Sequence, residues 1–586
     1  MILNYTLKKL KENITFDLRM LAIFRICLGI ILFIDVIDRA KDIEIFYSDN
    51  GALPLSNLYA LTAIRSGFSL NLINGSVTFQ ILLLLVMGIL SLMLIIGLKT
   101  RLTTILLWIF IVSIHNRNMS LLQGGDDLIR LVTFWSILLP LGAKYSIDRF
   151  LIKQEPESNK YLSLNVLAFV LQICFVYFFA SILKSSPIWN QDFTAGSYVY
   201  QIEMFTKHVG RIFYNFPELL KLMTFFVYYL ERYISILLLF PFFNKYTRTF
   251  GALLIIVMQF GFGFTMELGP FPWISMAVMI PLISPEVFLE IWDLTKKIFR
   301  KDKNETVIIQ ILYNLKNKKQ FITIRFIQSF FGLNNIKYVI NTRKDNKKGL
   351  FTIIKDNYEI NGYDAFLEIL SYSTFFRSLK FLFKFSIIKK LTTKFYYFIL
   401  KINVKFKSTE FNFYSFINIA ISTLTSVIFI SWIFAWNMNS VIPDSYQLST
   451  LATNSIYFLK LEQKWSMFSP YPFTDDGWFV IMANTKGNDR ISIFGNKEKT
   501  SLDKKPVDIA NTFPNERWRK YFTNLYDNNY LEYRRLFLDY LCKKSNNDNY
   551  NDQYKSIDMY YILTRIISPT KKEEPKKLLL LSYECK

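Results

Sequence analysis

The sequence predicts a mostly α-helical, polytopic membrane protein with about nine transmembrane helices, a small inserted α/β domain and a C-terminal extramembrane α+β region. Two observations favour a membrane protein. Of the 586 residues, 52% are hydrophobic and 17% are aromatic, which is more than an ordinary soluble domain contains. These residues also cluster in long runs, and the run ILLLLVMGILSLMLIIGL at 81–98 approaches the roughly 20 residues that cross a bilayer core.

The basic residues supply a third observation. The net charge is +23, and residues 295–410 hold 24 Lys and Arg against 8 Asp and Glu. No motif that reads DNA or RNA accompanies this charge, so we expect no nucleic-acid partner. Basic segments beside membrane helices are retained in the cytoplasm, where anionic lipid lies nearby. We therefore expect residues 295–410 to be cytoplasmic and membrane lipid to be a partner.

Nine apolar segments are expected to form membrane helices. They lie at residues 18–37, 77–98, 102–115, 128–142, 162–183, 222–243, 249–266, 271–291 and 415–437. The resulting domains are a transmembrane helical domain at 1–294, a basic domain at 295–410, a last transmembrane helix at 411–440 and a C-terminal α+β domain at 441–586. If successive helices cross the membrane in opposite directions, the short loops rich in Lys and Arg all fall on one side. Such loops are retained in the cytoplasm, so the N-terminus is expected to be cytoplasmic and the C-terminal domain external.

Two regions outside the membrane have strand and helix patterns. In residues 295–410, ETVIIQILYN, IKYVIN and LFTIIKDNYEIN have β-like runs, and FITIRFIQSFFG and YDAFLEILSY are helical. Their order, β-α-β-β-β-α, indicates a small thioredoxin-like domain. After residue 440, QKWSMFSPYPFTDDGWFVIMANTKGNDRISIFGN alternates as strands do, whereas NERWRKYFTNLY and EYRRLFLDYLC are helical.

Ionisable residues inside membrane helices are rare, and they usually face a bundle interior or an aqueous cavity. In this chain they recur in or at the ends of the predicted spans, as Arg25, Asp35, Arg39, Asp126, Arg130, Lys184, Glu231 and Glu267. In the expected topology, most of the helix ends that carry them lie on the external side. This convergence predicts a polar pocket that opens outward.

A structural interpretation stays open for these residues. Lys184 ends a span, where a lysine often extends its amine to the interface. Positive charge is depleted on the external side, however, and this favours a function for the amine. Asp35 and Arg39 are four residues apart on one helix face, as a structural ion pair requires. Glu231 serves either packing or the site.

The four cysteines and two histidines show no metal-binding spacing, so we expect no metal site. Cys542 and Cys585 both fall outside the membrane in the expected topology. They either form a disulfide or remain two free thiols.

Five motifs, taken in order, resemble the horizontally transferred transmembrane (HTTM) domain, which bacterial membrane proteins share with the vitamin K-dependent γ-glutamyl carboxylases. They are FRICLGIILFIDVIDRAKDIEIFYSDNGALP, HNRNMSLLQGGDDLIRLVTFWSILLPLGAKYSID, YFFASILKSSPIW, MELGPFPW and QKWSMFSPYPFTDDGW, within residues 17–294 and 415–525. The resemblance implies a multi-pass protein of the bacterial inner (plasma) membrane.

The carboxylases carry a Tyr-Phe-x-Ala-x-x-x-Lys-x-x-x-x-Trp motif, and this chain has Tyr177, Phe178, Ala180, Lys184 and Trp189 in register. In those enzymes the lysine is the base that deprotonates a reduced quinone before a glutamate is carboxylated. The resemblance therefore implies that Lys184 is a catalytic base and that a reduced quinone is the cofactor. An apolar, partly buried site favours the neutral amine that such a base needs.

The resemblance also implies further site residues. Asp126 or Asp127 stands near the position of a carboxylase histidine, and we expect Asp126 to be a catalytic polar partner of Lys184. Gln259 stands where the carboxylases have another histidine. The residues expected to bind substrate or anions, or to tune a pKa, are Arg25, Asp35, Arg39, Arg130, Trp189, Glu231 and Gln259.

Two classes of function follow. The first is a γ-carboxylase-like enzyme that modifies a secreted peptide or a lipid in an externally facing pocket. The second is a non-enzymatic membrane factor for the maturation, export or immunity of a secreted peptide. Residues 295–410 resemble the DCC family of thiol-disulfide oxidoreductase-like proteins. That family has a pair of cysteines where this chain reads LYNLKNKKQ, which contains no cysteine. The loss of the pair favours the second class. We expect this DCC-type domain to be degenerate and redox-inactive.

Overall fold

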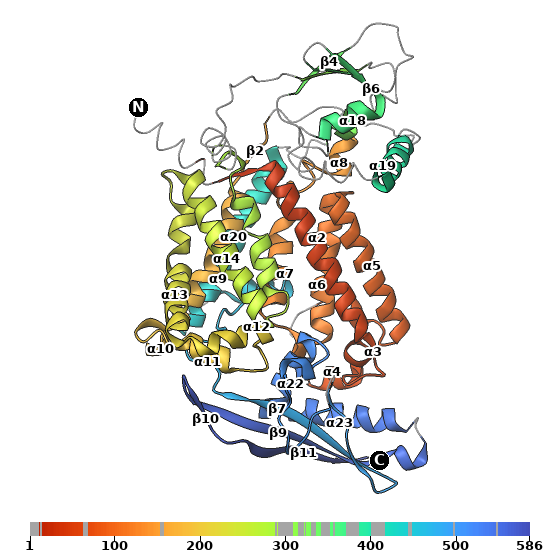
Figure 1. The fold of residues 1–586 in the computed structure, drawn as a ribbon, viewed down its shortest axis with the longest axis vertical. Helices are drawn as coiled ribbons and strands as arrows, with labels where there is room; N and C mark the ends of the chain where they lie inside the picture. The colour runs from red at the N-terminus through yellow and green to blue at the C-terminus, as the bar shows by residue number, and fades with distance from the viewer. Residues whose placement is uncertain are drawn as a thin grey trace.

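The computed structural model describes residues 11, 14–61, 68–152, 158–287 and 416–585, with gaps at 444–447, 496–498 and 547–548. Between 288 and 415 it describes residues 290, 309–313, 322, 324–327, 329, 336–340, 352–355, 358–370 and 386–399. A helical bundle forms the middle of the molecule, and a β-sheet lies at each end of the bundle (Figure 1).

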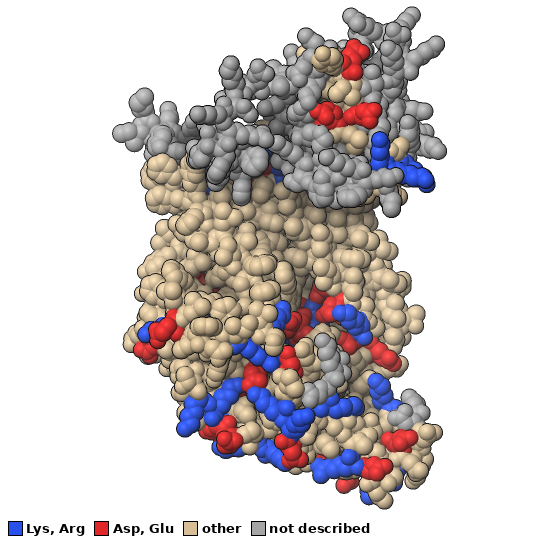
Figure 2. All heavy atoms as spheres, viewed as in Figure 1, with Lys and Arg blue, Asp and Glu red and all other residues tan. Residues whose placement is uncertain are grey.

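Six of the described helices are long and apolar enough to cross a membrane. They are α2 (Leu18–Lys41), α5 (Val77–Ile96), α9 (Leu164–Leu183), α13 (Pro217–Leu239), α14 (Asn244–Thr265) and α20 (Phe416–Val441). Each occupies a segment that the sequence predicts to be a span. A helix of about 20 residues is about 30 Å long, which matches a bilayer core. Charged side chains are sparse over the middle of the face shown in Figure 2, as contact with lipid requires. The chain is therefore a polytopic membrane protein.

The other three predicted spans form shorter or more polar helices, so the count of nine is not confirmed. α6 (Thr100–Arg117) has basic residues near both ends, α7 (Gly124–Ser136) has two aspartates in its first turn, and α15 (Phe271–Ala277) has only 7 residues. The predicted helix at 271–291 is wrong in its length. A 3-10 turn, η4 (Ile280–Leu282), follows α15, and Pro281 within it lacks the backbone N–H that would continue an α-helix.

The C-terminal region is an α+β structure at one end of the bundle (Figure 1). Its antiparallel strands are β7 (Asp475–Thr485), β8 (Arg490–Ser492), β9 (Tyr554–Ser568), β10 (Lys571–Lys572) and β11 (Lys576–Glu584). β7 pairs with β8 and β9, and β9 pairs in turn with β10 and β11. Two helices, α22 (Glu516–Tyr526) and α23 (Leu531–Ser545), accompany the sheet. The rings of Phe479 and Phe522 pack between β7 and α22, with centroids 4.9 Å apart.

Cys542 and Cys585 form a disulfide that ties the end of α23 to the end of β11. The two Cα atoms are 5.4 Å apart, within the range that a disulfide spans. Of the two states that the sequence left open, the structure contains the disulfide.

A four-stranded sheet lies at the opposite end of the bundle. Its strands are β3 (Ile309–Tyr313), β4 (Ile336–Ile340), β5 (Thr352–Lys355) and β6 (Tyr358–Asn361), in the order β4-β3-β5-β6, followed by α18 (Gly362–Leu370). β3 and β4 are parallel, and the other pairs are antiparallel. The strands fall in the segments with β-like patterns. The thioredoxin-like and DCC-type assignments stay predictions, and residues 314–320, where the DCC family has its cysteine pair, lie outside the described residues.

Shorter elements connect these parts. They are β1 (Thr15–Asp17), α3 (Ile43–Tyr47), α4 (Leu55–Leu61), η2 (Met119–Leu121), α8 (Ile147–Phe150), β2 (Lys160–Leu162), α10 (Pro187–Asn190), α11 (Ala195–Gln201), α12 (His208–Arg211), η3 (Ile212–Asn215), α19 (Ser386–Ile399) and α21 (Thr450–Phe458).

Candidate functional site

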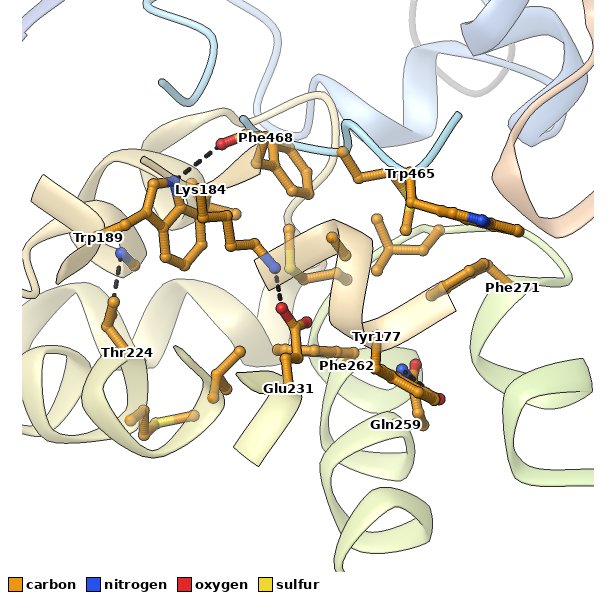
Figure 3. Close-up of a pocket in the computed structure, with 18 of the residues that line it drawn as sticks. Tyr177, Lys184, Trp189, Thr224, Glu231, Gln259, Phe262, Phe271, Trp465 and Phe468 are labelled. Atoms are coloured by element: carbon orange, nitrogen blue, oxygen red, sulfur yellow. Dashed lines mark hydrogen bonds and ion pairs between the residues drawn. The ribbon is translucent and has the colours of Figure 1, made fainter. Parts of the chain in front are cut away.

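Lys184 stands at the C-terminal end of α9, and its side chain points into the protein. The helix ends there because Ser185, Ser186 and Pro187 follow, and Pro187 begins α10. Only 6% of Lys184 is exposed. Its Nζ forms an ion pair with the carboxylate of Glu231, on the neighbouring helix α13, as Figure 3 shows. The amine therefore does not extend to the interface in this structure.

The Lys184–Glu231 pair lines a cavity of about 100 Å³ inside the bundle. Aromatic rings form much of its wall: Tyr177, Trp189, Tyr200, Phe262, Phe271, Trp465 and Phe468. The Lys184 Nζ lies 4.9 Å from the centroid of the Trp189 ring, a cation–π distance. The cavity is thus apolar along its walls and ionic at the pair.

A second polar group in the cavity wall is the amide of Gln259, on α14. Its Nε2 lies 3.5 Å from the hydroxyl of Tyr177. Its Oε1 is buried and has no hydrogen-bond partner in the part of the chain that the structure describes. Leaving a buried acceptor unpaired costs about 1–3 kcal/mol. The amide oxygen is therefore suited to accept a hydrogen bond from a ligand.

A segment beyond the last membrane helix covers the cavity. Trp465, Met467 and Phe468 line it, and the indole Nε1 of Trp189 donates to the carbonyl of Phe468 over 2.9 Å (Figure 3). Ser186 likewise donates to the carbonyl of Pro470. The lysine motif and the QKWSMFSPYPF motif, nearly 300 residues apart, are therefore parts of one site.

A second polar group of residues lies outside the cavity, where four buried charges form a neutral cluster. Arg39 Nε lies 2.7 Å from Asp35 Oδ2, and Arg39 Nη2 lies 2.7 Å from Asp126 Oδ1. Arg517 of α22 pairs with Asp35 and, over 3.2 Å, with Asp126. Since each carboxylate contacts both guanidinium groups, the cluster joins α2 and α7 to the C-terminal region.

Two further side chains complete the surroundings of Arg39. The guanidinium donates to the hydroxyl of Tyr47 over 2.8 Å, and the Nε2 of His115 lies 3.4 Å from it. His115 is also buried, at the end of α6. The cluster therefore draws on four separate segments of the membrane domain and on α22.

Glu516, beside Arg517, is a buried carboxyl at the same boundary. Burial raises its pKa to about 7, because the charged form loses its hydration and Asp126 lies nearby, although Arg517 opposes this effect. The Gln123 side chain donates to Glu516 Oε2. Glu516 therefore changes its charge near neutral pH.

The cavity and the charge cluster share a wall. Gly124 and Gly125 precede Asp126 at the start of α7, where a side chain would collide with the cavity wall. A Cβ on Gly125 would lie 2.6 Å from the backbone nitrogen of Phe271, and one on Gly124 would lie 3.2 Å from the Sδ of Met467. The glycine pair thus allows α7 to pack directly against two cavity-lining residues.

The predicted site residues therefore form two groups and not one pocket. Lys184, Trp189, Glu231 and Gln259 line the cavity. Asp35, Arg39 and Asp126 belong to the charge cluster. The structure does not bring Asp126 to Lys184, because Asp126 pairs with two arginines and does not line the cavity, so its expected catalytic role stays a prediction.

Arg25 and Arg130 have other environments. Arg25 donates to the backbone carbonyls of Ile95, Leu141, Lys144 and Tyr145. It lies ten residues before Asp35, about 15 Å along α2. Arg130 pairs with Asp127 over 3.1 Å and donates to the carbonyl of Glu462. Neither guanidinium lines the cavity, and the anion-binding or pKa-tuning role expected of each stays a prediction.

Arg517 and Glu516 were not among the site residues predicted from the sequence. Both lie in NERWRKYFTNLY, whose pattern predicts only an amphipathic helix. A buried charge requires a partner, but the sequence already offered Arg25, Arg130 and Lys184 as cations, so nothing in it singled out Arg517.

Residues 13–286 match the family model of the HTTM domain. This range contains α2 to η4 and hence all the membrane-domain residues of both groups. None of the curated proteins and none of the solved structures matches the chain.

Proposed function

We propose, from the premise that the chain carries an HTTM domain, that this multi-pass membrane protein is a carboxylase-like enzyme whose Lys184 cavity binds a reduced quinone. One observation carries the proposal. A buried lysine and a buried glutamate face each other at an aromatic-walled cavity inside the membrane domain. Ionisable groups buried inside a membrane domain are costly and usually functional.

The residues present fit a hydroxylated aromatic ring. A cavity of about 150 Å³ is known to hold benzene, so about 100 Å³ suits a single ring with modest adjustment of the walls. Phe262, Phe271 and Trp465 offer faces against which a ring packs. The unpaired Oε1 of Gln259 accepts from one hydroxyl, and the Lys184–Glu231 pair receives the other.

The chemistry of the chain's own residues is the transfer of a proton. Lys184 Nζ lies at the cavity wall, and as a neutral amine it takes the proton of the nearer hydroxyl, which leaves the negative charge beside an ammonium group. The aromatic walls exclude water, and this strengthens the attraction between the two charges. When bound, the quinol supplies the reducing equivalents for the later modification of a secreted peptide or a lipid.

We place this cavity toward the external side of a bacterial inner membrane, with the N-terminus and residues 295–410 in the cytoplasm. The Cys542–Cys585 disulfide supports an external C-terminal region, since disulfides persist in oxidising compartments. The basic composition of residues 295–410 supports the opposite location for that segment.

Ligand binding by Lys184 variants tests the proposal. The full chain in detergent is titrated with a water-soluble hydroquinone, and the dissociation constant is measured by calorimetry. We expect Lys184→Met to weaken binding at least about tenfold, because the cavity loses a charged hydrogen-bonding group. Lys184→Met combined with Glu231→Leu leaves no unpaired charge and controls for misfolding. Equal affinity in the wild type and both variants would refute the proposal.

A second function is favoured by the burial of the ion pair and by its cover. Lys184 pairs with Glu231, and the Trp189 ring beside the amine is held by the carbonyl of Phe468, as a structural strut requires. In that case the protein is a non-enzymatic factor for the maturation, export or immunity of a secreted peptide. The two functions differ in one result: a strut predicts that Lys184→Arg keeps full cellular function, whereas a base predicts its loss at normal protein abundance.

A further inference from the structure

We propose that Lys184 and Glu231 act as one base, and that Glu231 is itself a catalytic residue that carries a proton once the ligand is ionised. This inference rests on the proposed function, since it assigns the positions of the protons in the same cavity. It adds a carboxylate to a reaction otherwise assigned to the lysine alone.

The charge balance of the cavity is the first argument. Of the described residues that line the cavity, Lys184 and Glu231 are the only charged ones. Their side chains are 7% and 9% exposed. A single unpaired charge at such a site carries a desolvation cost of several kcal/mol. The resting site is therefore a neutral pair, and its chemistry involves both Lys184 and Glu231.

The position of the Glu231 carboxylate is the second argument. Glu231 lies well inside α13, 14 residues after Pro217, and its Oε2 contacts Lys184. Its Oε1 has no hydrogen bond within the described part of the chain. The Oε1 atom is not fully enclosed by the protein, and Glu231 lines the cavity. One oxygen therefore holds the lysine, and the other is available to a ligand.

The number of protons on the two side chains also supports the paired base. The pair has two forms with the same net charge of zero: ammonium with carboxylate, and amine with carboxylic acid. In the first form, the ligand O–H bond breaks, its electron pair stays on the ligand oxygen, and the proton bonds to a Glu231 oxygen. In the second form, the proton bonds to Lys184 Nζ. Both routes end with ammonium and carboxylic acid, and the +1 charge gained by the pair balances the −1 charge on the ligand.

The state of Glu231 in the complex is thus the distinguishing feature. A base made of Lys184 alone ends with Glu231 as a carboxylate. The pair ends with Glu231 as a carboxylic acid, whichever form it starts from. Infrared spectroscopy separates these two states, because a carboxylic acid has a carbonyl stretch that a carboxylate lacks.

The experiment uses the full chain in lipid nanodiscs with 4-nitrophenol as the probe, since the ionised phenol absorbs visible light. We expect bound 4-nitrophenol to be ionised and the complex to show a carboxylic-acid band that shifts when glutamate is labelled with ¹³C at the side-chain carboxyl. We expect Glu231→Gln to lose this band. Glu231→Asp, which keeps an acid, retains a band that glutamate labelling no longer shifts, so the assignment does not depend on one variant. Glu267→Gln, at an exposed ion pair with Lys207, is the matched control and leaves the band unchanged.

Each remaining outcome has a distinct meaning. If 4-nitrophenol binds in ionised form while Glu231 stays a carboxylate, the paired base is wrong and the proposed function stands with Lys184 alone. If the probe does not bind, or binds without ionising, the proposed function fails and the paired base fails with it.

Discussion

At the scale of single residues, the energetic problem of this protein is the burial of charge. The carboxylates of Asp35 and Asp126 are held by two guanidinium groups, and Lys184 is held by Glu231. Pairs of this kind gain little net stability over apolar packing, but removing one member costs about 3–5 kcal/mol. Their presence therefore argues for a role beyond packing, most directly in the cavity.

Glu516 gives a pH-dependent stability. Its pKa rises on folding from 4.5 to about 7, so the folded state binds a proton more tightly than the unfolded state. Below pH 4.5 the carboxyl is protonated in both states and acts as a neutral side chain. As the pH rises from 4.5 to 7, the folded state therefore loses stability relative to a protein with a neutral side chain at this position. We expect Glu516→Gln to be neutral below pH 4.5 and stabilising above pH 7, by up to about 3 kcal/mol.

Thermal unfolding of the detergent-solubilised protein between pH 4 and 8 measures this effect. Glu532→Gln, at an exposed ion pair with Arg535 in α23, is the control and keeps the pH dependence of the wild type. A Glu516→Gln curve parallel to the wild-type curve over this range would contradict the assignment.

At the scale of elements, the contact between α7 and α15 supports one part of the cavity wall, at Phe271. Gly125 allows α7 to approach the start of α15, because a Cβ there would lie 2.6 Å from Phe271 N and 2.8 Å from Pro270 Cγ. We expect Gly125→Ala to displace Phe271, lower the melting temperature and weaken hydroquinone binding about tenfold or more.

The matched control is Gly261→Ala in α14, because a Cβ at Gly261 meets no atom within 4 Å. Alanine also has a higher helix propensity than glycine, by about 1 kcal/mol. We expect this variant to bind hydroquinone like the wild type and to melt at the same or a higher temperature. Equal binding by the Gly125→Ala variant would show that α7 does not shape the cavity.

The helix α22 is one of the elements that join the C-terminal region to the bundle. Arg517→Met leaves Asp35 and Asp126 to share Arg39 alone, so we expect a loss of about 3–5 kcal/mol in the free energy of unfolding. We also expect faster proteolysis of the C-terminal region. Adding Asp35→Asn restores a balance of one arginine and one aspartate and should recover part of the loss. If the double variant is less stable than Arg517→Met, charge balance is not the basis of the contact.

At the scale of the whole molecule, long apolar runs predicted six membrane helices well, because their patterns are local. The predicted helix at 271–291 failed because Pro281 ends the pattern that the surrounding apolar residues suggest. The lysine motif located Lys184 and Trp189. The pairing of Lys184 with Glu231 and the role of Arg517 depend on contacts across 47 and 482 residues, which no local pattern contains.

The orientation of the whole chain makes a further prediction. If the C-terminal region is external, the cysteines of the Cys542–Cys585 pair should react with a membrane-impermeant thiol reagent in intact cells only after reduction. A cysteine introduced at Lys389, in α19, should react only after the membrane is made permeable. Labelling of the α19 position in intact cells would reverse the proposed topology.

The most direct test of the central claim is the identity of the compound that the cavity holds. The full chain is purified in native lipid nanodiscs, and the organic extract is analysed by mass spectrometry beside that of Ala180→Leu, which fills the cavity wall. We predict that an isoprenoid quinone or quinol is enriched with the wild type and reduced in the Ala180→Leu extract. An extract without such a compound, or equal amounts from both proteins, would contradict the account.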